Sequence, residues 1–276
     1  MIEAAVIGWP IEHSRSPMIH GYWLQRYGID GRYTKIAVKP EDVTAFVRSL
    51  AERGFAGCNV TLPHKEAVFQ AADVREASAE AVGAANTLWL EDGRLFAANT
   101  DTYGFMRHLD VSAPAWRTKD RPALLLGAGG AARGIVYGLL EAGVGNVRIA
   151  NRTLSRAEEI AQHFGSRVTA VAWRDAEAAA TDAGLLVNAT SLGMAKTGPL
   201  DFDVARLPAE AMVADIVYVP LETDLLRRAR ARDLTAVDGL GMLLHQAVPG
   251  FAKWFGVTPD VTDDLRDLLV ADIEGR

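Results

Sequence analysis

The stretch NVTLPHK, residues 59–65, places an amide, a hydroxyl and an ammonium group within seven residues, at the end of a short apolar run. Three other polar motifs stand where apolar runs are interrupted: HSRSP at 13–17, AANT at 84–87 and NTD at 99–101. Because the loops beyond the carboxyl ends of strands in an open α/β sheet converge on one crevice, we expect these motifs to share a site. Hydroxyls, amides, one ammonium and one carboxylate suit a small polyhydroxylated ligand.

Strands and helices alternate in the first hundred residues. Residues 3–8, 33–38 and 55–60 are apolar runs of strand length, separated by stretches with helical character. Ser16 before Pro17 is a good N-cap signal for the first helix, since proline at the first helical position has no amide hydrogen to lose. The alternation predicts an α/β domain with a largely parallel sheet.

Two features divide the chain. Asp92-Gly93 between two β-prone runs predicts a two-residue hairpin turn, which would make the first sheet mixed. Residues 111–122 combine proline, serine and charged residues without a period, which is typical of a linker. We therefore expect three segments: an α/β domain at 1–111 that carries the polar motifs and is the substrate-binding and catalytic domain, a second α/β domain at 112–238, and C-terminal helices at 239–276 that pack back on the first domain, with a cleft between the two domains.

The second segment opens with LLLGAGGAARG, in which Gly127, Gly129 and Ala132 fill a G-x-G-x-x-A pattern between a strand and a helix. The first glycine allows a tight turn, the second allows close approach of a pyrophosphate, and the small third residue allows close helix packing. The amides at the helix N-terminus then face the anion. We expect the dinucleotide to contact the turn residues Gly127, Ala128, Gly129, Gly130 and Ala131.

The end of the next strand indicates which dinucleotide binds. An NAD site has an acidic residue about 20 residues after the glycines, but no carboxylate occurs between residues 144 and 154. Arg152 could instead pair with a 2′-phosphate, assisted by Asn151, Thr153 and Arg156, which favours NADP(H). We therefore expect residues 112–238 to form a Rossmann-type NADP-binding domain. The alternative is that Thr153 or Ser155 caps the following helix and the arginines are only solvated.

Bulk properties exclude several classes of partner. A net charge of −6 over 276 residues argues against a nucleic acid or an anionic membrane surface. Cys58 is the only cysteine, so no intrachain disulfide can form. We expect Cys58 to act as a small apolar side chain that packs within a strand. The N-terminus lacks the basic start of a secretory signal, and the most apolar windows are interrupted before 18 residues. We expect a cytoplasmic protein.

Metal and hydrolase chemistry are poorly supported. His13, His20 and His64 lie near the polar motifs, but their spacing matches no metal-ligand pattern, so we expect no metal. A G-x-S-x-G nucleophile motif is also absent from the sequence. The dinucleotide motif instead indicates hydride transfer.

The motifs together resemble the shikimate dehydrogenase family. They run in that family's order from about residue 8 to 255: GWPIEHSRSPMIH, NVTLPHK, GAANTL, NTDTYG, GAGGAAR, NRT, NATSLGM, DIVYVPLETDLL and GLGMLLHQA. Two positions depart from it, since Gly21 stands where asparagine is common and Ala98 where glycine is common. These departures concern local loop geometry, because neither removes a side chain that carries chemistry.

The resemblance implies reversible, NADPH-dependent reduction of the C3 carbonyl of 3-dehydroshikimate to shikimate, a step of chorismate and aromatic amino acid biosynthesis. It makes Lys65 and Asp101 the catalytic pair, and it places Tyr218 on the nicotinamide side and in contact with substrate. The other substrate contacts that it implies are Ser14 and Ser16 for the carboxylate, with Asn59, Thr61, Asn86 and Gln246 for the hydroxyls and carbonyl region. The remaining nicotinamide-side residues are Thr190, Ser191, Met194, Gly239 and Met242.

The chemistry of these residues fits that activity. Hydride addition to a ketone builds negative charge on oxygen, and Lys65 could supply either a proton or a positive charge. Taken singly, Lys65 could be a solvated residue at a helix start and Asp101 a helix cap. Two rival functions remain open: a quinate/shikimate dehydrogenase with dual NAD(P) use, and a non-catalytic NADP-responsive regulator. We expect a monomer or homodimer.

Overall fold

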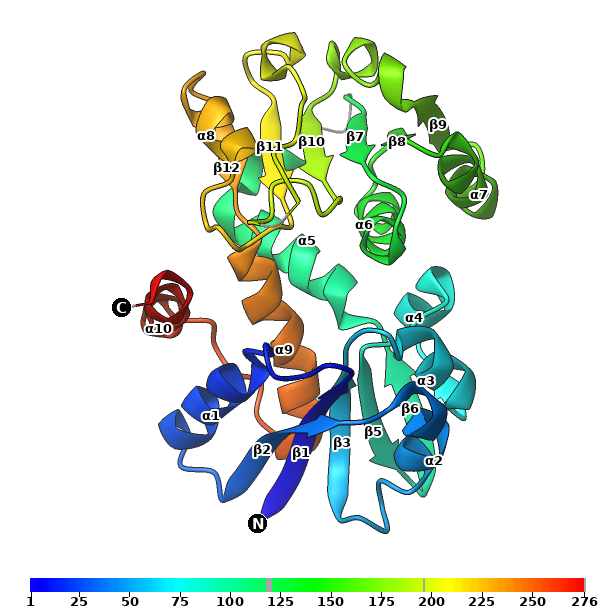
Figure 1. Ribbon diagram of the computed structural model, residues 1–276, viewed down its shortest axis with the longest axis vertical. Helices are drawn as coiled ribbons and strands as arrows, with labels where there is room; N and C mark the ends of the chain where they lie inside the picture. Colours follow the sequence, from blue (N-terminus) through cyan, green and yellow to red (C-terminus); the bar gives the residue numbers. More distant parts are fainter. Residues whose placement is uncertain (118–120, 196, 276) are drawn as a thin grey trace. The chain divides into compact units, whose positions relative to one another are not determined.

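The computed structural model describes residues 1–117, 121–195 and 197–275, and the chain forms two compact units. Unit 1 comprises Met1–Gly104 and Leu244–Arg276, and unit 2 comprises Phe105–Leu243. Both divisions fall inside helices, namely α5 (Thr100–Ser112) and α9 (Leu240–Phe255) (Figure 1). The sequence placed its boundaries a few residues away, at 111/112 and 238/239.

The segment 111–122 differs from the linker that its composition indicates. Ala113 and Trp116 are buried in the core of unit 2, and Pro114–Trp116 forms a short 3₁₀ helix, η2. Residues 118–120 of the predicted linker lie outside the described ranges. The proline and the charged residues indicated a linker, and the buried Trp116 was overlooked. The large apolar surface of this side chain holds the segment against the core.

The sheet of unit 1 is mixed, as the hairpin signal predicted. Its strand order is β2-β1-β3-β5-β6-β4, with β1 parallel to β2 and β3, and β5 antiparallel to both β3 and β6. Asp92 (φ 50°) and Gly93 (φ 72°) both adopt left-handed backbone, the requirement of a type I′ turn. The strands are β1 (Ile2–Gly8), β2 (Gly31–Ala37), β3 (Phe55–Val60), β4 (Val74–Arg75), β5 (Thr87–Glu91) and β6 (Arg94–Ala98).

Helices cover both faces of this sheet. Val47 of α2 and Val68 of α3 pack on the face that carries Ala5 and Ile7, whereas aromatic residues of α1 and α9 cover the opposite face. The expected cap of α1 is wrong: Ser16 is the first helical residue, and its amide donates to Ser14 Oγ at 3.4 Å. The helices of unit 1 are α1 (Ser16–Arg26), η1 (Pro40–Asp42), α2 (Val43–Arg48), α3 (Lys65–Ala71), α4 (Ala77–Val82) and α10 (Asp263–Glu274).

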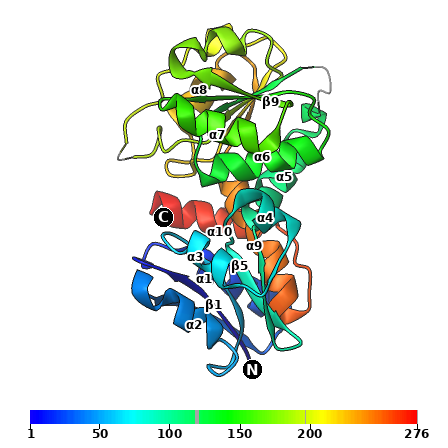
Figure 2. The ribbon, with the colours of Figure 1, turned by 90° about the vertical axis from the view of Figure 1, so that its right-hand side faces the viewer.

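Unit 2 has a parallel sheet with strand order β9-β8-β7-β10-β11-β12, the doubly wound Rossmann order. The prediction of a Rossmann-type fold is confirmed. In Figure 2 this sheet lies between α8 on one side and α6 and α7 on the other. The strands are β7 (Ala123–Leu126), β8 (Val147–Asn151), β9 (Val168–Ala172), β10 (Leu185–Asn188), β11 (Met212–Asp215) and β12 (Thr235–Val237).

The core of unit 2 follows from the strand pleat. Leu125 and Val187 face α6 and α7, whereas Leu124 and Leu186 face α8 and the short 3₁₀ turns. Strands that are buried on both faces have continuous apolar sequences, and for this reason the leucines before Gly127 could be predicted as a strand. The helices of unit 2 are α6 (Gly130–Glu141), α7 (Leu154–Phe164), η3 (Trp173–Asp175), η4 (Ala178–Ala180), η5 (Val204–Arg206) and α8 (Asp224–Arg230).

His20 lies at the centre of an aromatic cluster in unit 1. Its ring stacks on Tyr33 with centroids 3.9 Å apart and contacts Trp23, Phe251 and Trp254. The side chain is fully buried, and neither ring nitrogen has a hydrogen-bond partner within the described part of the chain. Burial lowers the pKa of His20 to about 3, with a smaller opposing effect from Asn59.

Burial of a neutral His20 predicts acid sensitivity. Below about pH 6.5 the unfolded chain takes up a proton that folded His20 does not, so stability is lost from about pH 6.5 down to about pH 3. The cost is about 1.4 kcal/mol per pH unit, or about 2 kcal/mol at pH 5. Urea unfolding at pH 7 and pH 5 should show a larger loss for the wild type than for His20→Phe, and equal losses in the two proteins would contradict this account.

Candidate active site

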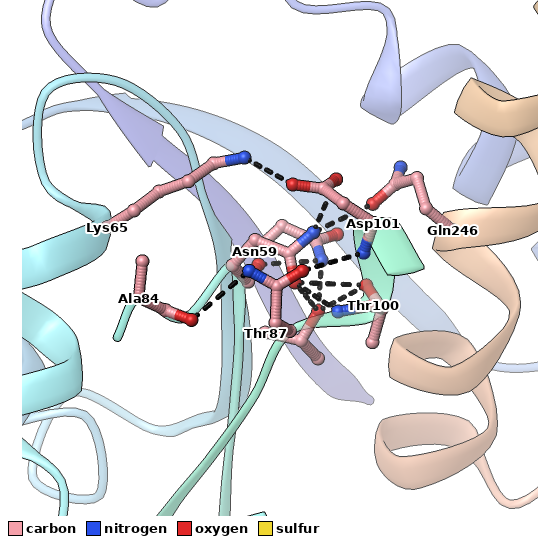
Figure 3. Close-up of polar contacts among 9 residues, drawn as sticks. Asn59, Lys65, Ala84, Thr87, Thr100, Asp101 and Gln246 are labelled. Atoms are coloured by element: carbon pink, nitrogen blue, oxygen red, sulfur yellow. Dashed lines mark hydrogen bonds and ion pairs between the residues drawn. The ribbon is translucent and has the colours of Figure 1, made fainter. Parts of the chain in front are cut away.

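The predicted catalytic pair is formed within unit 1. Lys65 is the first residue of α3, Asp101 lies in the first turn of α5, and Lys65 Nζ is 2.6 Å from Asp101 Oδ2. Figure 3 shows the ammonium directed at this carboxylate. The two side chains are 27% and 22% exposed, so they are partly desolvated and still reachable by a ligand. Partial desolvation strengthens the attraction between these charges relative to a surface pair.

Asn86 holds the carboxylate of this pair. Its Nδ2 donates to Asp101 Oδ1 at 2.9 Å and to Gln246 Oε1 at 3.5 Å. Its Oδ1 accepts from the Thr100 amide at 2.7 Å and from Thr100 Oγ1 at 3.1 Å. The side chain is buried, and both amide hydrogens have partners, so Asn86 orients Asp101 and links it to α9.

The strand pairing explains why these residues meet. Thr87 at the start of β5 is paired with Ala98 at the end of β6, and also with Asn59 of β3. Asn86 and Asp101 therefore flank the open end of one hairpin, beside the carboxyl end of β3. Asn99 Oδ1 accepts from the Asp101 amide at 3.2 Å, so Asn99 performs the helix-start role that Asp101 alone could have had.

Asn59 is engaged within the protein. Its Nδ2 donates to the Asn86 carbonyl at 3.2 Å and to Thr87 Oγ1 at 3.1 Å, and its Oδ1 accepts from the Tyr33 hydroxyl at 2.6 Å. Only 4% of Asn59 is exposed. The structure thus gives it structural partners, and its role as a substrate contact stays a prediction.

The other predicted substrate contacts of unit 1 lie at strand and helix ends. Ser16 is buried, Ser14 and Thr61 are half-buried, and the Thr61 amide donates to the Ile7 carbonyl at 2.9 Å. Ser14 also lines a cavity of about 400 Å³ together with Arg15. Their contacts with a ligand remain predictions.

The glycine turn of unit 2 fits a dinucleotide. Gly127 has φ +105°, and a Cβ there would lie 2.9 Å from Thr190 Cγ2 and 3.0 Å from the Ala189 carbonyl oxygen, so only glycine fits. A Cβ added to Gly129 or Gly130 would meet no atom within 4 Å. The backbone of the turn after β7, which includes Ala128, and of the first turn of α6, which includes Ala131, is therefore open to a pyrophosphate at a helix N-terminus.

The predicted 2′-phosphate residues follow β8. Asn151 Nδ2 donates to the Thr153 carbonyl at 2.8 Å, which shapes the turn, and Arg152, Thr153 and Arg156 are exposed. Thr153 occupies the N-cap position of α7, but its side chain accepts no hydrogen bond from the helix. Thr153 therefore does not cap the helix through its side chain, and the contact of this turn with a 2′-phosphate stays a prediction.

A buried network that sequence reasoning missed supports the loop after β10, which is predicted to lie beside the nicotinamide. Asp215 Oδ1 accepts from Asn188 Nδ2 at 2.9 Å and Asp215 Oδ2 from Thr223 Oγ1 at 2.7 Å. Asn188 Oδ1 in turn accepts from the amide and the hydroxyl of Thr190, at 3.0 and 2.7 Å. Burial raises the pKa of Asp215, against the opposing effect of its hydrogen bonds. Both Asn188 and Asp215 occur in quoted motifs, at the ends of apolar strands, and that position was the available signal.

The remaining predicted cofactor residues surround this loop or follow β11 and β12. Ser191 and Met194 are exposed, Tyr218 and Met242 are half-buried, and Gly239 is buried. A Cβ at Gly239 would lie 2.3 Å from the Ile216 carbonyl oxygen, so the backbones pack too closely for any other residue. Their contacts with a cofactor remain predictions.

Metal sites and membrane spans are two other possibilities for this chain. Within residues 1–117, 121–195 and 197–275, no three His, Cys, Asp or Glu side chains are grouped as metal ligands. In the same described ranges, no helix has both the length and the apolarity that a bilayer span requires.

Comparison with known proteins gives the family. Residues 6–88 match the model of the shikimate dehydrogenase substrate binding domain, 111–201 that of shikimate/quinate 5-dehydrogenase, and 239–267 that of the shikimate 5′-dehydrogenase C-terminal domain. A shikimate dehydrogenase (NADP(+)) of Azorhizobium caulinodans is 55% identical, over 100% of this chain and 98% of that protein. The chain belongs to the shikimate dehydrogenase family.

Solved structures in this family have the same fold. A Thermus thermophilus shikimate 5-dehydrogenase in complex with NADP(H) and shikimate has a TM-score of 0.86 at 35% identity, covering 100% of this chain and 99% of that chain. A Corynebacterium glutamicum quinate dehydrogenase in complex with NAD has a TM-score of 0.89 at 32% identity, covering 98% and 99%. The predicted family and fold class are confirmed.

The turn after β8 predicts cofactor preference. In an Arg152→Asp variant a carboxylate replaces the cation, so it should repel a 2′-phosphate and weaken NADPH binding at least tenfold while changing NADH binding little. Fluorescence titration with both cofactors checks this. Arg206→Asp makes the same charge change at another exposed arginine of unit 2, before the amino end of β11, and should leave both affinities unchanged. An unaltered NADPH/NADH ratio in Arg152→Asp would refute the assignment.

Proposed function

We propose that the protein catalyses the reversible, NADPH-dependent reduction of 3-dehydroshikimate to shikimate, with Lys65 and Asp101 handling the proton. The observation that carries this proposal is the Lys65–Asp101 pair at 2.6 Å, held by Asn86 within a cluster of polar side chains. The curated relatives named shikimate dehydrogenase (NADP(+)) support the reaction and the cofactor. An NADP-dependent oxidoreductase is the enzyme class that follows.

Lys65 and Asp101 have different roles in the proposed reaction. Reduction forms a C–H bond and an O–H bond, and the bound nicotinamide supplies the hydride for the first. Lys65 lies where an ammonium can donate the proton for the second, and it can take a proton back when the alcohol is oxidised. Asp101 keeps the ammonium in place and can accept a hydrogen bond from a neighbouring substrate hydroxyl. Asn86 and Gln246 fix the carboxylate, so little reorganisation is needed during the reaction.

The nucleotide contacts follow from unit 2. The open backbone at Gly129 and Gly130 accommodates the pyrophosphate, and Arg152 selects the 2′-phosphate. Thr190 is held by Asn188, so the loop that faces the nicotinamide is ordered before binding. Ser14 and Ser16 bind the carboxylate of the substrate, and Tyr218 contacts the substrate from the nucleotide unit. The protein acts in the cytoplasm, as a monomer or homodimer.

A quinate dehydrogenase activity is the second candidate, because the quinate dehydrogenase structure in complex with NAD shares the fold along nearly the whole chain. The turn NRT at 151–153 favours NADP and so argues against the NAD-linked version. Initial rates with shikimate and with quinate, each with NADP⁺ and NAD⁺, separate the candidates by absorbance at 340 nm. A non-catalytic regulator would show no rate with any combination.

Removal of the Lys65 ammonium tests the mechanism. Lys65→Ala should lower kcat roughly a hundredfold to ten-thousandfold with little change in the KM for shikimate, because the lost interaction acts in the transition state. Lys253→Ala is the matched control, since Lys253 pairs loosely with Glu76 at 3.9 Å elsewhere in unit 1. Normal turnover by Lys65→Ala would exclude this lysine from the chemistry.

A further inference from the structure

Tyr33 lies behind the polar cluster and has no place in the proposed chemistry. It belongs to β2, is 7% exposed, and its hydroxyl donates to Asn59 Oδ1 at 2.6 Å. His20 stacks on the ring of Tyr33 at an interplanar angle of 8°, and the ring centroid of Trp254 is 5.9 Å from that of Tyr33. The tyrosine ring is therefore packed on more than one side. Rigid packing gives the hydroxyl one direction.

The hydroxyl of Tyr33 is a permanent donor. Burial raises the pKa of Tyr33 well above its ordinary value, and the opposing effect of the Ser16 side chain is smaller. Asn59 Oδ1 is an acceptor only, so the hydrogen bond runs from the phenol to the amide oxygen. The Asn59 amide is thereby locked with its NH₂ group turned away from Tyr33.

The locked amide acts on the backbone at Asn86. Asn59 Nδ2 donates to the Asn86 carbonyl at 3.2 Å and to Thr87 Oγ1 at 3.1 Å. Thr87 Oγ1 donates to Asn86 Oδ1 at 3.2 Å and lies 3.0 Å from Thr100 Oγ1. The backbone carbonyl of Asn86 is therefore held by Asn59, and its side-chain oxygen by Thr87. Figure 3 shows Asn59, Thr87 and Thr100 grouped beneath Asp101. Asn86, held in this way, fixes the orientation of the Asp101 carboxylate through the hydrogen bond from its Nδ2 to Asp101 Oδ1 at 2.9 Å.

We propose that Tyr33 is a positioning residue for the Lys65–Asp101 pair, acting through Asn59 and Asn86. This role rests on the proposed function, since it matters only if the pair performs the chemistry. The hydroxyl of Tyr33 donates to Asn59 rather than to Lys65 or Asp101, so its effect on the pair runs through the chain of hydrogen bonds described above. It also assigns Asn59 to support the site from within.

Tyr33→Phe removes the donor and keeps the ring stacked on His20. The expected result is a fall in kcat of about tenfold, as is typical when a partner behind a functional group is lost, with the KM for NADPH unchanged. The pH profile of kcat should also shift, because the environment of Asp101 changes. Tyr22→Phe is the matched control, since it removes a tyrosine hydroxyl that contacts Thr262 Oγ1 at 3.0 Å in the same unit, and it should behave as wild type.

A double-mutant cycle with Asn59→Ala separates positioning from general loss of structure. If Tyr33 acts through Asn59, adding Tyr33→Phe to Asn59→Ala should lower kcat no further. A kcat of Tyr33→Phe within twofold of wild type overturns the proposal. So does a loss that matches only a smaller folded fraction in thermal unfolding, with the pH profile unmoved. Wild-type protein inactive with shikimate and NADP⁺ would instead reject the proposed function itself.

Discussion

The site depends on one buried amide. Asn86 uses both hydrogens of its side chain on Asp101 and Gln246 and its oxygen on Thr100, so the carboxylate that pairs with Lys65 has one orientation. The two side chains of the pair are about one-quarter exposed, so without Asn86 water could replace the contact between them. With the carboxylate held by Asn86, the Lys65 ammonium is the group that we propose meets the ligand, since hydride transfer to a ketone requires a proton or a positive charge at the oxygen.

The fold of unit 1 places this amide through its antiparallel hairpin. A purely parallel sheet would deliver one loop per strand to the carboxyl edge, whereas β5 and β6 bring the start of one strand and the end of the next to the same point, at Thr87 and Ala98. Asn59 at the end of β3 is paired with Thr87, so three segments meet there. The type I′ turn at Asp92-Gly93 sets the register of the hairpin and therefore the approach of Asn86 to Asp101.

Local chemistry made much of this predictable from the sequence. Asp92-Gly93, the glycine turn at Gly127 and the apolar runs each follow from backbone or burial rules that act within a few residues. Tyr33 could not be found in that way, because its partner Asn59 is 26 residues away in the sequence. Asn188 and Asp215 were marked only by their positions at strand ends, because the hydrogen bond between them spans 27 residues. Trp116 was missed because proline and charged residues in its segment indicated a linker, and the Ser16 cap was wrong because the helix begins at Ser16 itself. The predicted substrate and cofactor contacts await a ligand.

The geometry of the proton transfer is tested most directly by a crystal structure of the protein with shikimate and NADP⁺. The account predicts Lys65 Nζ within hydrogen-bond distance of the substrate hydroxyl whose carbon faces the nicotinamide, with Asp101 still held by Asn86. An ammonium directed into solvent, remote from that hydroxyl, would contradict it.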